Sequence, residues 1–162
     1  MSTREVISIL VKNQSNVLTR IASLYGRRGY NIDSLTVSTT NDPATSRITI
    51  VFDGNEQILN QIILQTKKLE VVKSISILSP EQSIYRELLL LKVDCNKENR
   101  SNLVEIVNIY RGKVISLTKN FMIIELTGSP NKIDGFIEMI NCYSIQDVCR
   151  TGITGISRNE HI

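Results

Sequence analysis

Histidine is nearly absent from this chain, whose 162 residues include only His161, next to the C-terminus. A histidine-based triad or a metal cluster therefore lacks its usual members, and no two acidic side chains make a compelling acid/base pair. The eight glycines are isolated, so neither a phosphate-binding loop nor a dinucleotide fingerprint exists. We expect no catalytic residue and no metal site on this chain.

Cysteine is also scarce, and the three residues present are Cys95, Cys142 and Cys149. Their number is odd and no pair has C-x-x-C spacing, which argues against a disulfide framework and against a zinc site. We expect reduced, buried thiols in a cytoplasm-like compartment.

Long apolar runs and a targeting segment are missing as well. The longest run of leucines, residues 88–91, is closed by Glu87 and Lys92, so no membrane span is expected. The N-terminus enters a strand pattern at once, without an apolar or Arg/Ser-rich presequence. We expect a soluble protein of the cytoplasm or, given the Ile-, Asn- and Lys-rich usage, of the plastid stroma.

Periodicity predicts the order β-α-β-β-α-β within residues 1–78. Alternating strand patterns cover residues 6–11, 32–38, 47–53 and 71–78, and two amphipathic helical patterns lie between them. Ser15 or Asn16 is placed to cap the first helix, and Asn55 the second. Arg27 and Arg28 are interpreted as the last turn of the first helix, stopped by a left-handed Gly29. This order is the ferredoxin-like, split βαβ arrangement.

The same order returns after a short linker, residues 79–84, which contains Pro80. A second unit, residues 85–162, has four further strand patterns and two helical patterns, the second capped by Ser129. The stretches "RGYNIDSLT" from Arg28 and "RGKVISLT" from Arg111 match if one deletion is allowed. We therefore predict an α+β protein of two tandem ferredoxin-like βαββαβ domains.

RNA-recognition modules share this element order, and the net charge of +3 neither requires nor excludes an anionic partner. Those modules stack bases on aromatic side chains of the first and third strands. Here these strands carry only Phe52, aromatic residues make up 5% of the chain, and tryptophan is absent. We expect no nucleic-acid partner.

A ligand could bind at the turn "KNQSNVL", residues 12–18, between the first strand and the first helix. The first N–H groups of a helix lack intrahelical acceptors, and the positive end of the helix dipole lies there, so a carboxylate or phosphate is favoured. Asn13, Ser15 and Asn16 could instead serve only as helix caps, which is common for these residue types.

The stretch "VKNQSNVLTRIASLYGRRGYNIDSLTVS" resembles the opening of the ACT domain in the regulatory (small) subunit of acetohydroxyacid synthase, also called acetolactate synthase. Further segments are similar to that family in the same order: "DPATSRITIVF", "LNQIILQTKKLEVVKS", "RELLLLKV", "YRGKVISLT", "GSPNKIDGFIEMI" and "RTGITGISR". The resemblance covers nearly the whole chain.

The resemblance implies a non-catalytic partner that binds no cofactor itself. In this family the catalytic large subunit holds thiamine diphosphate, magnesium and FAD. The small subunit activates it and confers feedback inhibition by a branched-chain amino acid, usually valine, on the route to valine, leucine and isoleucine. The small subunits form a homodimer through their ACT domains. The alternative is a free-standing ACT-type amino-acid sensor that acts on another enzyme or on a transcription regulator.

The resemblance also implies an effector site shared by two chains, formed by Asn13, Ser15, Asn16, Val17 and Leu18 of one chain with Asn31 and Ile32 of the other. Backbone N–H groups from Asn16 to Leu18 would bind the carboxylate, and the side-chain oxygens of Asn13 and Asn31 the ammonium. The family usually has glycine where this chain has Asn16, and asparagine is the next most tolerant residue for a left-handed conformation. In the second domain no ligand is implied, and "RTGITGISR" either contacts the large subunit or caps the sheet.

Overall fold

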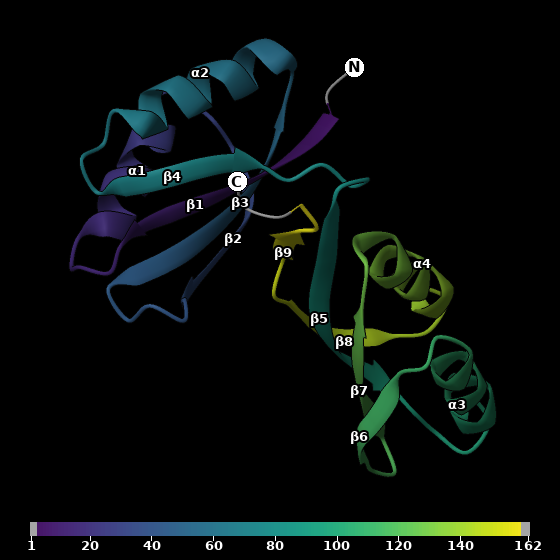
Figure 1. The fold of residues 1–162 in the computed structure, drawn as a ribbon. Coiled ribbons are helices and arrows are strands. Elements are labelled where there is room, and N and C mark those ends of the chain that lie inside the picture. The colour runs from purple at the N-terminus through teal and green to yellow at the C-terminus, as the bar shows by residue number, and fades with distance from the viewer. Residues whose placement is uncertain (1–2, 160–162) are drawn as a thin grey trace. The chain divides into compact units, whose positions relative to one another are not determined.

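The computed structural model describes residues 3–159, in which the elements follow the predicted order (Figure 1). The first set is β1 (Thr3–Lys12), α1 (Val17–Arg27), β2 (Ile32–Thr39), β3 (Thr45–Gly54), α2 (Glu56–Lys67) and β4 (Val72–Ile77). The second set is β5 (Ser83–Asp94), α3 (Arg100–Ile109), β6 (Lys113–Leu117), β7 (Phe121–Gly128), α4 (Pro130–Ile140) and β8 (Ile145–Arg150), followed by β9 (Thr154–Ser157). The α+β prediction of two βαββαβ sets is confirmed.

The chain forms two compact units, and they differ from the expected domains in one segment. The first unit contains the residues up to Ile84 and also those from Gly152 onward, while the second is Tyr85–Thr151. From the sequence we expect residues 152–162 in the second domain, which spans residues 85–162. In the structure Gly152 and Ile153 lie against strand β2 of the first unit, and these contacts join the segment to that unit.

In the first unit, four antiparallel strands are ordered β2-β3-β1-β4, and α1 and α2 pack on one face of this sheet (Figure 1). The strand residues that face the helices alternate with those that do not, as the period of two requires. The buried core comprises Ile7, Ile9, Val11, Val17, Ile21, Tyr25, Ile48, Ile50, Phe52, Leu59, Ile62 and Val71.

The second unit repeats this plan with the strand order β6-β7-β5-β8. Its separate core comprises Leu89, Leu91, Val93, Cys95, Leu103, Val107, Met122, Ile124, Leu126, Ile133, Phe136 and Ile140. The backbone hydrogen bonds at corresponding turns also match. The Lys12 N–H donates to the Val71 carbonyl (2.9 Å), and at the corresponding place the Asp94 N–H donates to the Ser144 carbonyl (2.8 Å). One residue later, the Asn13 N–H donates to the Ala44 carbonyl (2.9 Å) and the Cys95 N–H to the Asn120 carbonyl (2.9 Å).

The two matching sequence stretches are nevertheless not structurally equivalent. The left-handed residue that ends the first helix of each unit is Gly29 (φ 69°) in one and Arg111 (φ 56°) in the other. Gly29 therefore corresponds to Arg111 and not to Gly112. Ser34 pairs with the seventh residue of β3, whereas Ser116 pairs with the third residue of β7. The two units therefore share a topology, but the two sequence stretches do not occupy equivalent positions in it.

Gly29 ends α1 as expected, with the Tyr30 N–H donating to the Tyr25 carbonyl at 3.2 Å. Gly29→Ala should lower the free energy of unfolding by about 1 kcal/mol, because a left-handed conformation costs a residue with a Cβ about that much. A Cβ at this position would meet no atom within 4 Å, so the cost is conformational alone. Urea denaturation measures the change.

Gly26→Ala is the matched control, since it adds the same methyl group inside α1, also with no atom within 4 Å. A glycine in a helix interior is destabilising by roughly 0.5–1 kcal/mol relative to alanine, so this variant should gain stability. Changes of the same sign in both variants would contradict the assignment of Gly29.

Candidate functional site at the start of helix α1

The turn before α1 is anchored on the hairpin between β2 and β3. The Asn13 N–H donates to the Ala44 carbonyl and its side-chain Nδ2 to the Pro43 carbonyl, both at 2.9 Å. These two bonds use the backbone N–H and one of the two side-chain N–H groups of Asn13, and they leave its side-chain oxygen available as an acceptor. Sequence patterns do not predict this anchor, because the partners are about thirty residues apart in the chain.

Asp42 organises that hairpin. Its carboxylate accepts from the Thr45 hydroxyl at 2.6 Å and from the Ala44 N–H at 3.0 Å, and Lys73 lies 3.5 Å away. The Thr45 hydroxyl first, then the Ala44 N–H and Lys73, hold the pKa of Asp42 below its ordinary value. This contribution to stability is complete above the unfolded pKa of about 3.9 and is lost as the pH falls through the lowered one.

Asn16 precedes α1 in a left-handed conformation, with φ 67° and ψ 1°. Its carbonyl accepts the Arg20 N–H at 3.1 Å, but its side chain accepts no capping hydrogen bond. The expectation that Ser15 or Asn16 caps the helix with its side chain is therefore wrong. The reason is the backbone: an N-cap side chain normally reaches the helix N–H groups from an extended conformation, not from a left-handed one.

The start of α1 is consequently open. Among the described residues, none accepts a hydrogen bond from the N–H of Val17 or Leu18, and the first turn holds no acidic side chain. The Val17 side chain is buried in the core, so this residue offers only its backbone, while the Leu18 side chain is 43% exposed. The positive end of the helix dipole and these N–H groups together favour an anion.

The other helices start differently. Asn55 and Ser129 cap α2 and α4 as expected, accepting from the Ile58 N–H at 2.9 Å and the Lys132 N–H at 3.4 Å. Before α3, the Asn96 side chain accepts from the N–H groups of Glu98 and Asn99, at 2.9 and 3.0 Å. The turn that corresponds to residues 13–16 is thus closed in the second unit by its own asparagine.

Asn31 and Ile32 lie away from this turn within one chain. They follow the C-terminal end of α1, whose 11 residues separate them from the turn by about 16 Å along the helix. The Asn31 side chain is exposed, and its Nδ2 lies 3.5 Å from the Asp33 carboxylate. Ile32 is half-buried against the first core. The structure groups Asn13, Ser15, Asn16, Val17 and Leu18, and does not bring Asn31 and Ile32 to them.

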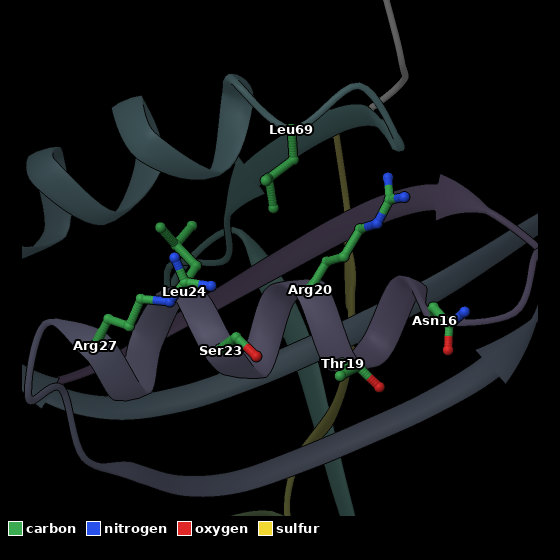
Figure 2. A pocket seen from close by; sticks show the side chains of 7 residues that line it. All are labelled: Asn16, Thr19, Arg20, Ser23, Leu24, Arg27 and Leu69. Atoms are coloured by element: carbon green, nitrogen blue, oxygen red, sulfur yellow. The ribbon is translucent and has the colours of Figure 1, made fainter.

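A shallow pocket of about 290 Å³ runs along the flank of α1 (Figure 2). Its lining residues are Asn16, Thr19, Arg20, Ser23, Leu24, Arg27 and Leu69. Asn16 stands at one end of this row and Arg27 at the other, along the length of the helix (Figure 2). Only Asn16 was predicted as a site residue. Leu69 follows α2, and the remaining five repeat along α1 at helical spacing, a signal that solvent-facing helix positions also produce.

The described residues hold no group of three or more histidine, cysteine, aspartate or glutamate side chains suited to a metal ion. His161 lies outside them.

Cys95 is buried, but Cys142 and Cys149 are exposed, so the expectation of three buried thiols is wrong for those two. No helix in the described part of the chain is long and apolar enough to cross a membrane. The geometry of the turn suits binding of a small anion.

Comparison with known proteins covers both units. A model described as the AHAS small subunit-like ACT domain matches residues 7–74, and one described as the small subunit of acetolactate synthase matches residues 86–159. A probable acetolactate synthase small subunit from Archaeoglobus fulgidus is 40% identical over 156 residues, 96% of this chain and 97% of the relative. The acetolactate synthase isozyme 3 small subunit of Escherichia coli K12 is 37% identical over 160 residues, 98% of each chain.

A solved structure agrees with these relatives. The crystal structure of the acetolactate synthase small subunit from Thermotoga maritima superposes with a TM-score of 0.89 at 33% identity. The match covers 98% of this chain and 99% of that one. The similarity therefore extends to the arrangement of elements in both units.

Asp42→Ala should release the turn, because it removes the hydrogen bonds that shape the hairpin under Asn13. We expect hydrogen exchange at the Asn13 amide to accelerate several-fold, because the hairpin that holds this amide would open more often. Asp53→Ala is the control, since it removes the same charge from an exposed position at the other end of β3. Equal exchange rates in the two variants would contradict the anchoring role.

Proposed function

The chain belongs to the family of acetolactate synthase small subunits, and from this we propose that it binds a branched-chain amino acid and makes its catalytic partner sensitive to it. Valine is the expected effector. The observation that carries the proposal is the open start of α1, where unpaired N–H groups follow the left-handed Asn16. The role is regulatory, and the reaction itself belongs to the large subunit, which would hold thiamine diphosphate, magnesium and FAD.

The chemistry of an amino acid fits this turn. Its carboxylate would accept from the N–H groups of Val17 and Leu18, at the positive end of the helix dipole. Its ammonium would donate to the side-chain oxygen of Asn13, whose Nδ2 is already bound to Pro43. A charge-assisted hydrogen bond contributes about 1.5–3 kcal/mol, enough to orient a ligand this small.

We further propose that the site is completed by a second copy of the chain. The separation of about 16 Å along α1 keeps Asn31 from sharing a ligand with the turn of its own chain. In a homodimer paired through the ACT units, the Asn31 oxygen of the second copy would reach the ammonium. A ligand that contacts two chains can bias how they pack, which is what regulation of a third protein requires.

Asparagine at position 16 is compatible with this function. The φ of 67° is the conformation that the family's usual glycine would adopt without strain, and asparagine tolerates it better than most residues. The exposed side chain bonds to none of the N–H groups that would hold the carboxylate. We propose that effector binding survives this substitution. A cytoplasmic or plastid location, where the large subunit would be present, is part of the same proposal.

The test is the rate of acetolactate formation by the purified large subunit from the same source. Adding this chain should raise the rate, and adding valine should then lower it. Asn31→Ala should keep the activation but require about tenfold more valine for half inhibition, because it deletes a hydrogen bond to a charged group. Absence of any change in rate on adding the wild-type chain would overturn the regulatory role.

Asn60→Ala is the control for this assay. Asn60 is exposed on α2 and is not a proposed effector ligand, so this variant should match the wild type in both activation and valine response. Equal valine sensitivity in the Asn31 and Asn60 variants would remove Asn31 from the site while leaving the regulatory role in place.

A further inference from the structure

The first sheet has polar residues buried at the centre of the face that points away from its helices. On β1 and β3, Ser8 and Thr49 pair with each other, and each is 2% exposed. On the neighbouring β2, Ser34 and Thr36 point to the same face, since they pair with Val51 and Thr49. At strand β2 this face is contacted by a segment that comes much later in the chain.

At strand β2 the covering part is residues 152–157, which we call the returning segment because the chain re-enters the first unit there. Gly152 has a φ of 79°, and a Cβ on it would lie 2.4 Å from the Ser34 Cβ. Any other residue would suffer both backbone strain and a steric clash. The Ser34 hydroxyl is buried, with no hydrogen-bond partner in the described structure. The segment therefore lies directly on β2.

A second contact follows one residue later. The Thr36 hydroxyl donates to the Ile153 carbonyl at 3.1 Å, and Ile153 is 2% exposed. The returning segment thus touches the back of β2 at two successive outward-facing positions, Ser34 and Thr36. From the sequence we expect "RTGITGISR" either to contact the large subunit or to cap the sheet of the second domain. In the structure Gly152 and Ile153 lie on the sheet of the first unit instead.

Strand β2 needs such support, because it is an edge strand with a single neighbour, β3. Its pairing is irregular at the start, where the register shifts between Ile32 and Ser34. Asn31, the proposed effector ligand, directly precedes this irregular stretch. The start of β2 pairs with one neighbouring strand and contains a register shift, so its backbone is less restrained than that of a central strand. The contact with the returning segment on the outer face of β2 therefore adds to its order.

We propose that docking of the returning segment on β2 is coupled to effector binding, with Gly152 and Thr36 as positioning residues for Asn31 and Ile32. This inference rests on the proposed function. A docked segment orders the start of β2 before the ligand arrives, so less ordering remains to oppose binding. Coupling is reciprocal, so the bound effector must stabilise the docked segment by the same free energy. Effector binding at the site would then change the ordering of the returning segment as well.

Hydrogen exchange of the wild-type chain gives the first test. Valine should slow exchange of the amides of residues 152–157, although these residues lie more than a hundred positions from Asn31 in the sequence. Unchanged exchange there, while the amides of Val17 and Leu18 become protected, would overturn the coupling and leave the effector site intact.

Thr36→Val gives the second test, since it removes the hydroxyl with little change in volume. Calorimetric titration should show valine binding about fivefold more weakly, the equivalent of one lost hydrogen bond of about 1 kcal/mol. Thr39→Val, on the same strand but facing the other way, is the control and should bind as the wild type does. Thermal unfolding verifies that both variants fold.

The outcomes separate the two claims. Equal affinity in the Thr36 and Thr39 variants would overturn the coupling alone. Failure of the wild-type chain to bind valine, leucine or isoleucine would overturn the proposed effector, and the coupling with it.

Discussion

The backbone N–H groups at the start of α1 have no acceptor among the described residues, and the properties of this site depend on that. A helix start is ordinarily closed by the side chain of its N-cap residue, but the left-handed Asn16 turns its side chain away from this task. The hairpin holds the turn in place through two hydrogen bonds to Asn13, so the open groups keep a fixed direction. An anion bound there would accept the hydrogen bonds for which the described residues supply no acceptor.

The second unit is an internal control for this argument. It has the same strand order and the same backbone hydrogen bonds at the corresponding turn, so the fold alone does not create an open helix start. There Asn96 occupies the N–H groups that a ligand would need. One supersecondary unit is therefore used twice, once with an open helix start and once with that start closed by an asparagine side chain. A few side chains before the helix make the difference.

Local patterns predicted most of the fold, and long-range contacts account for what was missed. Hydrophobic periods placed the helices and the first eight strands, and the caps at Asn55 and Ser129 follow from residues three positions apart. The anchoring of Asn13 on Pro43 and the docking of Gly152 on Ser34 join distant parts of the chain, and no local pattern encodes them. Asn16 is an intermediate case. The sequence predicts that asparagine tolerates a left-handed conformation, but only the backbone geometry shows that its side chain does not cap the helix.

The central claim is that a branched-chain amino acid binds at the open start of α1 and not at the closed turn before α3. Titration of the ¹⁵N-labelled full-length chain with valine, followed by NMR, tests it most directly. The account predicts that the amide resonances of Val17 and Leu18 shift with valine concentration, while those of Glu98 and Asn99 do not. Shifts confined to the second unit, or no shift at Val17 and Leu18 under saturating valine, would contradict it.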